Sequence, residues 1–493
     1  MRRFFIPLIS ILLLLSPSIC FSDPTSRDSF DWEGTKITSF VGDETDVVIP
    51  DGTTEIGNHA FYQCSSLKSV VIPKGVTKIG KEAFQECTSL KSVIIPEGVT
   101  KIEDSAFRGC NDLTSVTLPK SVTVIEDAAF DDCYSLTFIE IPNGVTGIGV
   151  FAFGNCESLE SIVIPESVIE IGDYAFWECK SLKTVKISNG VKSIGLSAFE
   201  GCPSLTTVII PDSVKKLGDG VFWGCSALKE WPISPTHPHF QSAGAGLLTK
   251  DGKTFLSCLC SAKEYQIPEG VATINDNAFY DCNLLTSVTI PKSLTEIGES
   301  AFSCCNDLTT VVIPNSVKKI GGSAFRACTS LRTVVIPDSV TKIEMGTFTG
   351  CESLTSVVIP ESVTEIGASA FYECVSLTSI TIPGGVKTLG DSAIRGCKAL
   401  KSVTISKGVK VIGLGCFQEC PALTSVVIPD GVTEIGTCAF SRCDALTTVV
   451  IPESVTEIGL CAFYDCPNLT IHAPKGSKAE EYAKENNISF QAK

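Results

Sequence analysis

The chain repeats one pattern every 23 residues over most of its length. Leucine follows the repeated cysteine by three residues, and phenylalanine precedes it by three residues, with Ile394 as the one exception. Such a period is typical of a solenoid, in which each repeat forms one coil stacked on its neighbours. The cysteines in register form two blocks: Cys64, Cys87, Cys110, Cys133, Cys156, Cys179, Cys202 and Cys225, then Cys282, Cys305, Cys328, Cys351, Cys374, Cys397, Cys420, Cys443 and Cys466.

One unit, Leu377 to Cys397, shows how a coil folds. Ile380 and Ile382 alternate at the strand period of two, so both face one side of a strand. Pro383 ends that strand because it cannot donate to a sheet ladder. Leu389 points inward from a second extended segment, and a turn returns Cys397 to the core. We therefore predict a β-rich, right-handed solenoid with a parallel sheet on one face and short helical or 3-10 turns on the other.

The N-terminal residues 1–22 resemble a secretory signal peptide. Arg2 and Arg3 precede an apolar stretch over residues 6–15, and Ser22 is a small residue at a cleavage position. Cys20 as a lipid-attachment site is the alternative. The apolar stretch is shorter than the ~20 residues of a membrane span, and no second long apolar segment follows. We expect a secreted or cell-surface chain without a transmembrane span.

The net charge is −16 and the sequence pI is about 4.9, with no run of basic residues. An acidic chain repels phosphate backbones, so nucleic acid is disfavoured as a partner. No Gly-rich phosphate loop and no Gly-x-Ser-x-Gly elbow occurs, because the glycines recur with the repeat. The sequence thus predicts no enzyme and no cofactor.

The repeat pattern Leu-x-x-Val-x-Ile-Pro, Val-x-x-Ile-Gly, Ala-Phe-x-x-Cys resembles the BspA-type leucine-rich repeats. The resemblance spans Ile49 to Leu469, with one interruption. The segments TKITSFVG and DVVIP resemble that family's N-terminal capping hairpin, and residues 475–490 its C-terminal cap of a short helix and a last strand. The resemblance implies secreted or surface proteins that bind other macromolecules, and no catalytic residues.

The predicted organisation has six parts. They are a signal peptide (1–22), an N-terminal cap (23–48), a first array (49–228), a hairpin insert (229–266), a second array (267–469) and a C-terminal cap (470–493). The insert includes a predicted hairpin, residues 246–258, around Asp251-Gly252. It also contains His237, His239, Cys258 and Cys260, a Cys₂His₂ set that could bind zinc. Because this spacing matches no common zinc module, a Cys258–Cys260 disulfide or two separate thiols is the alternative.

The repeated cysteines would stack in a column with neighbours ~4.8 Å apart, which permits disulfides. Their apolar position favours buried thiols that act as small hydrophobic side chains. An oxidising extracellular space argues in the opposite direction. Cys438 and Cys461, outside the column but 23 residues apart, are the better candidates for a disulfide.

Outward strand positions five residues after the repeated cysteines are almost all Ser or Thr, and those two further on are mostly β-branched. β-propensity alone would produce such rows. The alternative is a flat platform with few charges for an extended polypeptide or a glycan. The candidate binding residues are Phe138, Glu140, Lys186, Thr333, Ser356, Ser379 and Ser402.

The sequence therefore favours an adhesin-like binding protein whose partners are extracellular proteins or glycans. A structural envelope component that associates with itself is the second hypothesis. A metal-dependent hydrolase with its site on the insert is the third.

Overall fold

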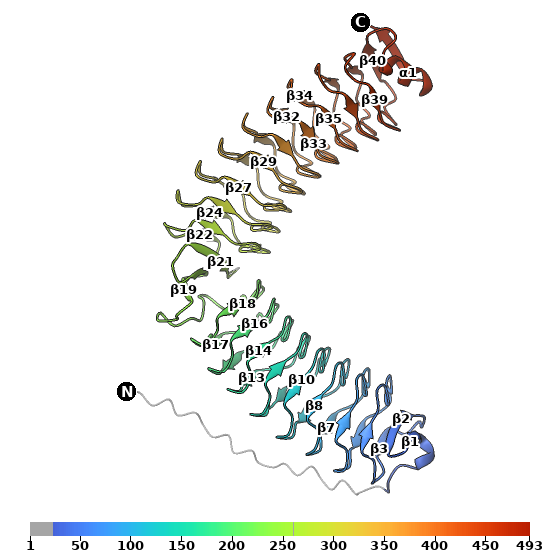
Figure 1. Ribbon diagram of the computed structural model, residues 1–493, viewed down its shortest axis with the longest axis vertical. Helices are drawn as coiled ribbons and strands as arrows, with labels where there is room; N and C mark the ends of the chain where they lie inside the picture. Colours follow the sequence, from blue (N-terminus) through green and yellow to red (C-terminus); the bar gives the residue numbers. More distant parts are fainter. Residues whose placement is uncertain (1–22, 260) are drawn as a thin grey trace.

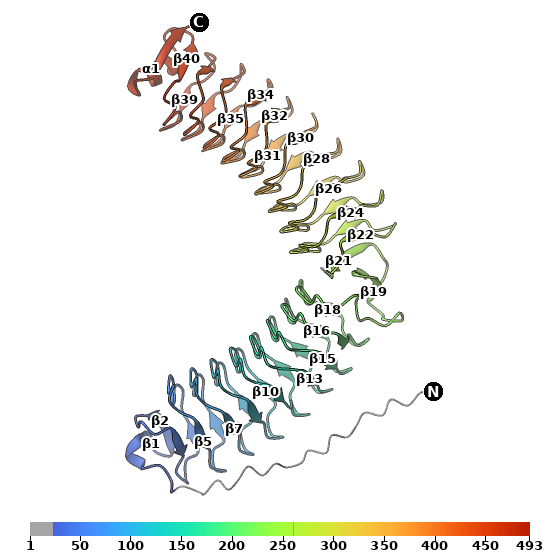
Figure 2. The ribbon, with the colours of Figure 1, turned by 180° about the vertical axis from the view of Figure 1, so that it is seen from behind.

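The computed structural model describes residues 23–259 and 261–493, which form an elongated arc (Figure 1). The N-terminal strands lie at one end of the arc and the C-terminal helix at the other. The segment between the two arrays lies at the middle, on the convex side, in both views (Figures 1 and 2). Within these residues no helix is both long and apolar enough to cross a membrane. The predicted signal peptide and Cys260 lie outside the described residues.

Each coil contributes one strand to a first sheet face, here called the long-strand face. These strands pair in parallel with those of neighbouring coils, as Ser161 does with Thr184, except between β11 and β13, between β17 and β22 and between β30 and β32. The strands are β3 (Asp46–Val48), β5 (Ser69–Val71), β7 (Ser92–Ile94), β9 (Ser115–Thr117), β11 (Phe138–Ile139), β13 (Ser161–Ile164), β15 (Thr184–Ile187), β17 (Thr207–Ile209), β22 (Glu264–Gln266), β24 (Ser287–Thr289), β26 (Thr310–Val311), β28 (Thr333–Val335), β30 (Ser356–Val358), β32 (Ser379–Ile382), β34 (Ser402–Ile405), β36 (Ser425–Val427), β38 (Thr448–Val450) and β40 (Thr470–Ala473).

After the Ile-Pro turn, each coil adds a shorter strand to a second face, here called the short-strand face. These strands also pair in parallel within each array. They are β2 (Lys36–Phe40), β4 (Glu55–Ile56), β6 (Lys78–Ile79), β8 (Lys101–Ile102), β10 (Val124–Ile125), β12 (Gly147–Ile148), β14 (Glu170–Ile171), β16 (Ser193–Ile194), β18 (Lys216–Leu217), β21 (Thr254–Cys258), β23 (Thr273–Ile274), β25 (Glu296–Ile297), β27 (Lys319–Ile320), β29 (Lys342–Ile343), β31 (Glu365–Ile366), β33 (Thr388–Leu389), β35 (Val411–Ile412), β37 (Glu434–Ile435) and β39 (Glu457–Ile458).

The third side of each coil consists of consecutive turns, and this completes the predicted solenoid with little helix. Two residues per coil adopt left-handed backbone conformations, as at Ser392 (φ 54°) and Gly396 (φ 75°). These residues interrupt any continuous helix. Alternate backbone amides instead bond to the next coil, as Phe61 N does to the Ala83 carbonyl at 2.7 Å. The turn side is therefore a third ladder between coils.

The core is a stack of columns, one residue of each kind per coil. Phe84 and Phe107 are fully buried, their ring centroids are 5.3 Å apart and their planes differ by 3°. Ile394 takes the place of phenylalanine in the same column and is equally buried. Because one coil cannot bury its apolar side alone, stacking supplies most of the stability.

The apolar core has two parts that meet at the insert, where Ala245 packs against both. The predicted hairpin is present, since β20 (Gly246–Thr249) pairs antiparallel with β21. The sequence did not indicate a second hairpin, in which β19 (Phe240–Ala243) pairs with β20. The strand β22 precedes the predicted start of the second array at residue 267, so its long-strand face begins inside the predicted insert.

Both ends of the described chain are capped. At the N-terminus the hairpin pairs β1 (Phe30–Glu33) with β2, after the 3-10 turn η1 (Arg27–Ser29). The predicted hairpin partner, the segment DVVIP, instead forms β3 of the parallel long-strand face. Gly34 allows this tight reversal because its φ is 63°. At the C-terminus the helix α1 (Lys478–Glu485) and the strand β41 (Ser489–Ala492) cover the last coil, as predicted.

Candidate binding surface

The long-strand face presents the residues that alternate with the core. In β28, Val334 is 2% exposed whereas Val335 is 60% exposed. The predicted candidates Thr333, Ser356, Ser379 and Ser402 are all exposed on neighbouring strands of this face. Their outward orientation is therefore as expected.

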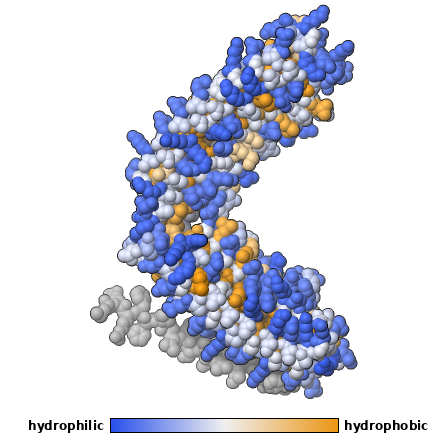
Figure 3. Space-filling view, in the orientation of Figure 1, coloured by the Kyte–Doolittle hydropathy of each residue, from blue (hydrophilic) through white to orange (hydrophobic). Residues whose placement is uncertain are grey.

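Apolar side chains gather in the second outward row of this face. Exposed valine and isoleucine side chains are normally scattered singly, so a row of them on one face suggests interaction. The space-filling view shows apolar areas among the polar surface of both arms (Figure 3). The exposed apolar members of the row are Val71, Ile94, Val163, Ile209, Val312, Val335, Val358 and Val427.

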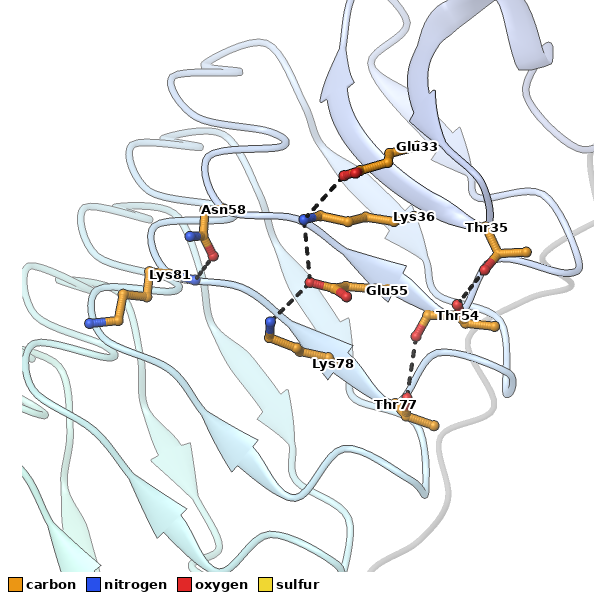
Figure 4. A network of polar contacts seen from close by, with 9 residues as sticks. All are labelled: Glu33, Thr35, Lys36, Thr54, Glu55, Asn58, Thr77, Lys78 and Lys81. Carbon is orange, nitrogen blue, oxygen red and sulfur yellow. Dashed lines mark hydrogen bonds and ion pairs between the residues drawn. The ribbon is translucent and has the colours of Figure 1, made fainter.

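The short-strand face differs because charged residues run along it. Glu55 lies 3.0 Å from the Lys78 ammonium and 3.7 Å from that of Lys36 (Figure 4). Similar pairs join Lys319 to Glu296 at 2.6 Å and Lys342 to Glu365 at 2.8 Å. Opposite charges on adjacent strands stabilise one register of the ladder. Several charges of this face are therefore neutralised by residues of neighbouring coils.

Neutral polar groups extend the same ladder between coils. Thr54 contacts the Thr35 hydroxyl, with 2.7 Å between the two oxygens, and its carbonyl accepts from the Thr77 hydroxyl at 3.4 Å. The Asn58 side chain accepts from the Lys81 amide at 3.1 Å (Figure 4). These side chains thus stabilise coil stacking, which is a sufficient reason for the recurrence of threonine at the position of Thr54 and Thr77.

The long-strand sheet of the first array is interrupted between β11 and β13. A shallow depression of about 710 Å³ lies there, and Phe138, Glu140, Val163 and Lys186 line it. The structure thus brings together the three candidates of the first array. A second depression, of about 810 Å³, lies beside it along β15 and β17 and shares Lys186.

His237, one of the four predicted zinc ligands, is held by hydrogen bonds on both sides of its ring. His237 is fully buried, and its Nδ1 accepts from the amides of His239 and Phe240, each at 3.2 Å. Its proton is therefore on Nε2, which donates to the Pro211 carbonyl at 3.1 Å. Burial lowers the pKa of this ring. Both ring nitrogens thus have hydrogen-bond partners within the described residues.

Three members of the predicted zinc set, His237, His239 and Cys258, lie within the described residues. The described residues hold no cluster of three or more His, Cys, Asp or Glu side chains arranged to bind a metal. Cys258 is buried beside the Leu259 carbonyl. Zinc binding by the four residues remains a prediction, since Cys260 is not described.

The repeated cysteines serve the stack in a way that sequence reasoning missed. The Cys87 thiol donates to the Phe61 carbonyl of the preceding coil at 3.1 Å, and Cys374 donates to Phe348 at 3.2 Å. Burial raises the pKa of Cys64 to about 11 and that of Cys351 to about 12. Thiols of this kind stay protonated and unreactive at neutral pH. Cys438 and Cys461, the candidates for a disulfide, both have free thiols in the structure.

Sequence reasoning also missed an aromatic contact that joins the two arrays. Trp223 and Tyr280 lie with ring centroids 4.6 Å apart across the insert, and the Asn277 amide lies 3.4 Å from Asp219. Both aromatic residues stand two positions before a repeated cysteine. That shared register was the signal that could have identified the pair.

Comparison with known proteins connects this geometry to a family. The model of the BspA type leucine rich repeat region matches residues 40–160, 146–243, 251–374 and 341–470. None of the curated proteins compared matches the chain.

Three solved structures show which proteins the chain is similar to. A leucine-rich repeat protein from Eubacterium ventriosum is 26% identical with a TM-score of 0.53, covering 60% of this chain and 85% of its own. One from Bacteroides ovatus is 26% identical, covering 94% and 97%, with a TM-score of 0.41. A leucine rich cell surface protein from Faecalibacterium prausnitzii is 26% identical, covering 94% of each chain, with a TM-score of 0.42. Because the family model matches more than half of its length, the chain belongs to the BspA type leucine rich repeat family.

Proposed function

We propose that the chain is a secreted or cell-surface protein that binds extracellular proteins or glycans and does not catalyse a reaction. The observation that carries this proposal is the contrast between the two sheet faces. Exposed β-branched side chains such as Val335 and Val358 line one face, while the other face has charged side chains, several of them in ion pairs such as that of Lys342 with Glu365.

The part of the long-strand face that fits a ligand best lies in the second array, from β28 to β34. There the outward rows contain hydroxyl, methyl and valine groups, and no charged side chain. A ligand can lie on such a surface without burying an unpaired charge. The hydroxyls of Thr333, Ser356 and Ser379 can donate to or accept from a peptide or a sugar.

The test is a binding array of extracellular-matrix proteins and glycans, probed with the purified chain and with a triple variant. The variant contains Ser356→Arg, Ser379→Arg and Ser402→Arg, which places three charges on adjacent strands. The proposal predicts saturable binding to at least one target and its loss in the folded variant. If the variant still binds saturably, the long-strand face is excluded as the binding site. If neither protein binds anything, the role of a structural envelope component is favoured.

A further inference from the structure

One short stretch of the long-strand face has a charge pattern of its own. Between β5 and β17, Glu140 and Lys186 are the only charged side chains in the two outward rows. Both are exposed, and neither belongs to an ion pair within the described residues. They lie in the same row two coils apart, roughly 10 Å at strand spacing. Each charge therefore lacks an ion-pair partner among the described residues.

Val163 lies midway between the two charges, in the same row and 55% exposed. A two-fold axis that passes through Val163, parallel to the strands and in the plane of contact, would reverse the order of the coils. Glu140 of one copy would then face Lys186 of the other, and the reciprocal pair would form on the opposite side. This is the self-complementary arrangement that a two-fold symmetric interface requires.

The same axis pairs the neighbouring row. It brings Phe138, which is 59% exposed, against the strand β15 of the second copy at Thr184. Thr184 lines the depression of about 810 Å³, together with Ile209. The Phe138 ring of each copy would thus enter the depression of the other copy, so this contact also occurs twice. Sheets that pack face to face with their strands within about 30° of each other form a common arrangement.

We infer that the β9–β17 part of the long-strand face binds a second copy of this chain, as a two-fold dimer centred on Val163. The charge pattern favours this occupant over an unrelated partner because one axis satisfies both charges and places both phenylalanines. The β28–β34 part of the face, proposed above for ligand binding, stays outside the contact. The two inferences can therefore fail independently.

The size of the contact sets its strength. Five strands at ~4.8 Å spacing give a contact about 24 Å long. The surface area that such a contact buries is smaller than that of a stable obligate interface. The dimer is therefore expected to dissociate in the micromolar range and to depend on protein concentration.

The test is sedimentation equilibrium of the purified chain and of two charge-reversal variants, Glu140→Lys and Lys186→Glu. Each variant alone juxtaposes like charges across the axis twice, so its self-association should weaken at least about tenfold. An equimolar mixture of the two variants restores both opposite-charge pairs. The mixture should therefore dimerise about as well as the parent chain, which a misfolded variant could not do.

Matched controls place the same charge changes on the short-strand face. Glu170→Lys and Lys216→Glu lie in β14 and β18 of the same array, exposed and outside the ion pairs described. They should leave dimerisation unchanged. A parent chain that stays monomeric to 100 micromolar or so would overturn the inference. So would a dimer that both reversals leave intact, or a mixture that fails to associate.

Discussion

The two sheet faces of this solenoid come from the same coils but have different chemistry. On the short-strand face, several glutamate and lysine side chains of adjacent coils form ion pairs, as Glu55 does with Lys78. On the long-strand face, Val335 and Val358 are exposed on adjacent strands, and the outward residues around them are uncharged. Hydrogen bonds must join neighbouring coils on every side of the stack. Charged side chains are needed for solubility on one face only, here the short-strand face. The other face is thus available for contacts with other molecules.

The core that separates the faces is the same throughout each array. The same columns of leucine, phenylalanine and cysteine lie behind both the long-strand face and the short-strand face. Differences in binding should therefore follow from outward residues, and differences in stability from inward residues. The predictions below use this separation.

The largest effect is expected when a charge replaces an inward residue of the long-strand face. Val334→Asp buries a carboxylate at a position that is 2% exposed, and it should cost about 4 kcal/mol or more. Val335→Asp changes the next residue on the same strand, which is 60% exposed, and should cost less than about 1 kcal/mol. Urea unfolding of the two variants measures the difference. Equal costs would show that the register of β28 is wrong.

Alkaline pH should destabilise the core and leave the faces unaffected at first. Burial raises the pKa of Cys64 and Cys466 to about 11 and of Cys351 to about 12, from an ordinary value of 9.0. Because the folded pKa exceeds the unfolded one, this stability is complete below pH 9 and is lost as pH rises toward the folded values. In that range each buried thiol lowers the free energy of unfolding by up to about 1.4 kcal/mol per pH unit.

The melting temperature should accordingly stay constant from pH 7 to 8.5 and fall steeply above pH 9. Differential scanning calorimetry across this range, under reducing conditions, makes the measurement. If the melting temperature is the same at pH 8 and pH 11, the repeated thiols are not buried as described.

The smallest effect is expected on the short-strand face. Glu55→Gln removes the carboxylate that Lys36 and Lys78 share, and partly exposed pairs of this kind contribute at most about 1 kcal/mol. The decrease in the free energy of unfolding should be smaller still at high salt, because salt screens the ion pairs. Urea unfolding at low and high salt checks this, with Glu170→Gln, which has no ion pair among those described, as its control. A loss above about 2 kcal/mol would mean that this face supports the fold more than its exposure suggests.

Periodicity made much of this fold predictable. The alternation in Leu377 to Ile382 identifies buried and exposed positions because a strand has a period of two. The same register correctly places Ser379 and Ser402 on the surface.

Local features without repetition were not predictable in the same way. The strand β1 pairs with β2 across Gly34, but its sequence FDWE has no copy elsewhere to identify it. The bond from the Cys87 thiol to the Phe61 carbonyl needs atomic positions. Likewise, only the structure shows that both nitrogens of His237 are engaged. The depression at Glu140 and Lys186 depends on an interruption of the sheet that no residue pattern marks.

The most direct test of the central claim is to charge one face and then the other in the same coils. The partner found in the binding array would be titrated against the parent chain, the Ser356, Ser379 and Ser402 arginine variant, and a matched variant with Glu365→Arg, Thr388→Arg and Val411→Arg. The matched residues lie on the short-strand face in β31, β33 and β35. The account predicts that the long-strand variant weakens binding about a hundredfold or more and the matched variant less than about threefold. Equal losses, or a larger loss from the matched variant, would contradict it.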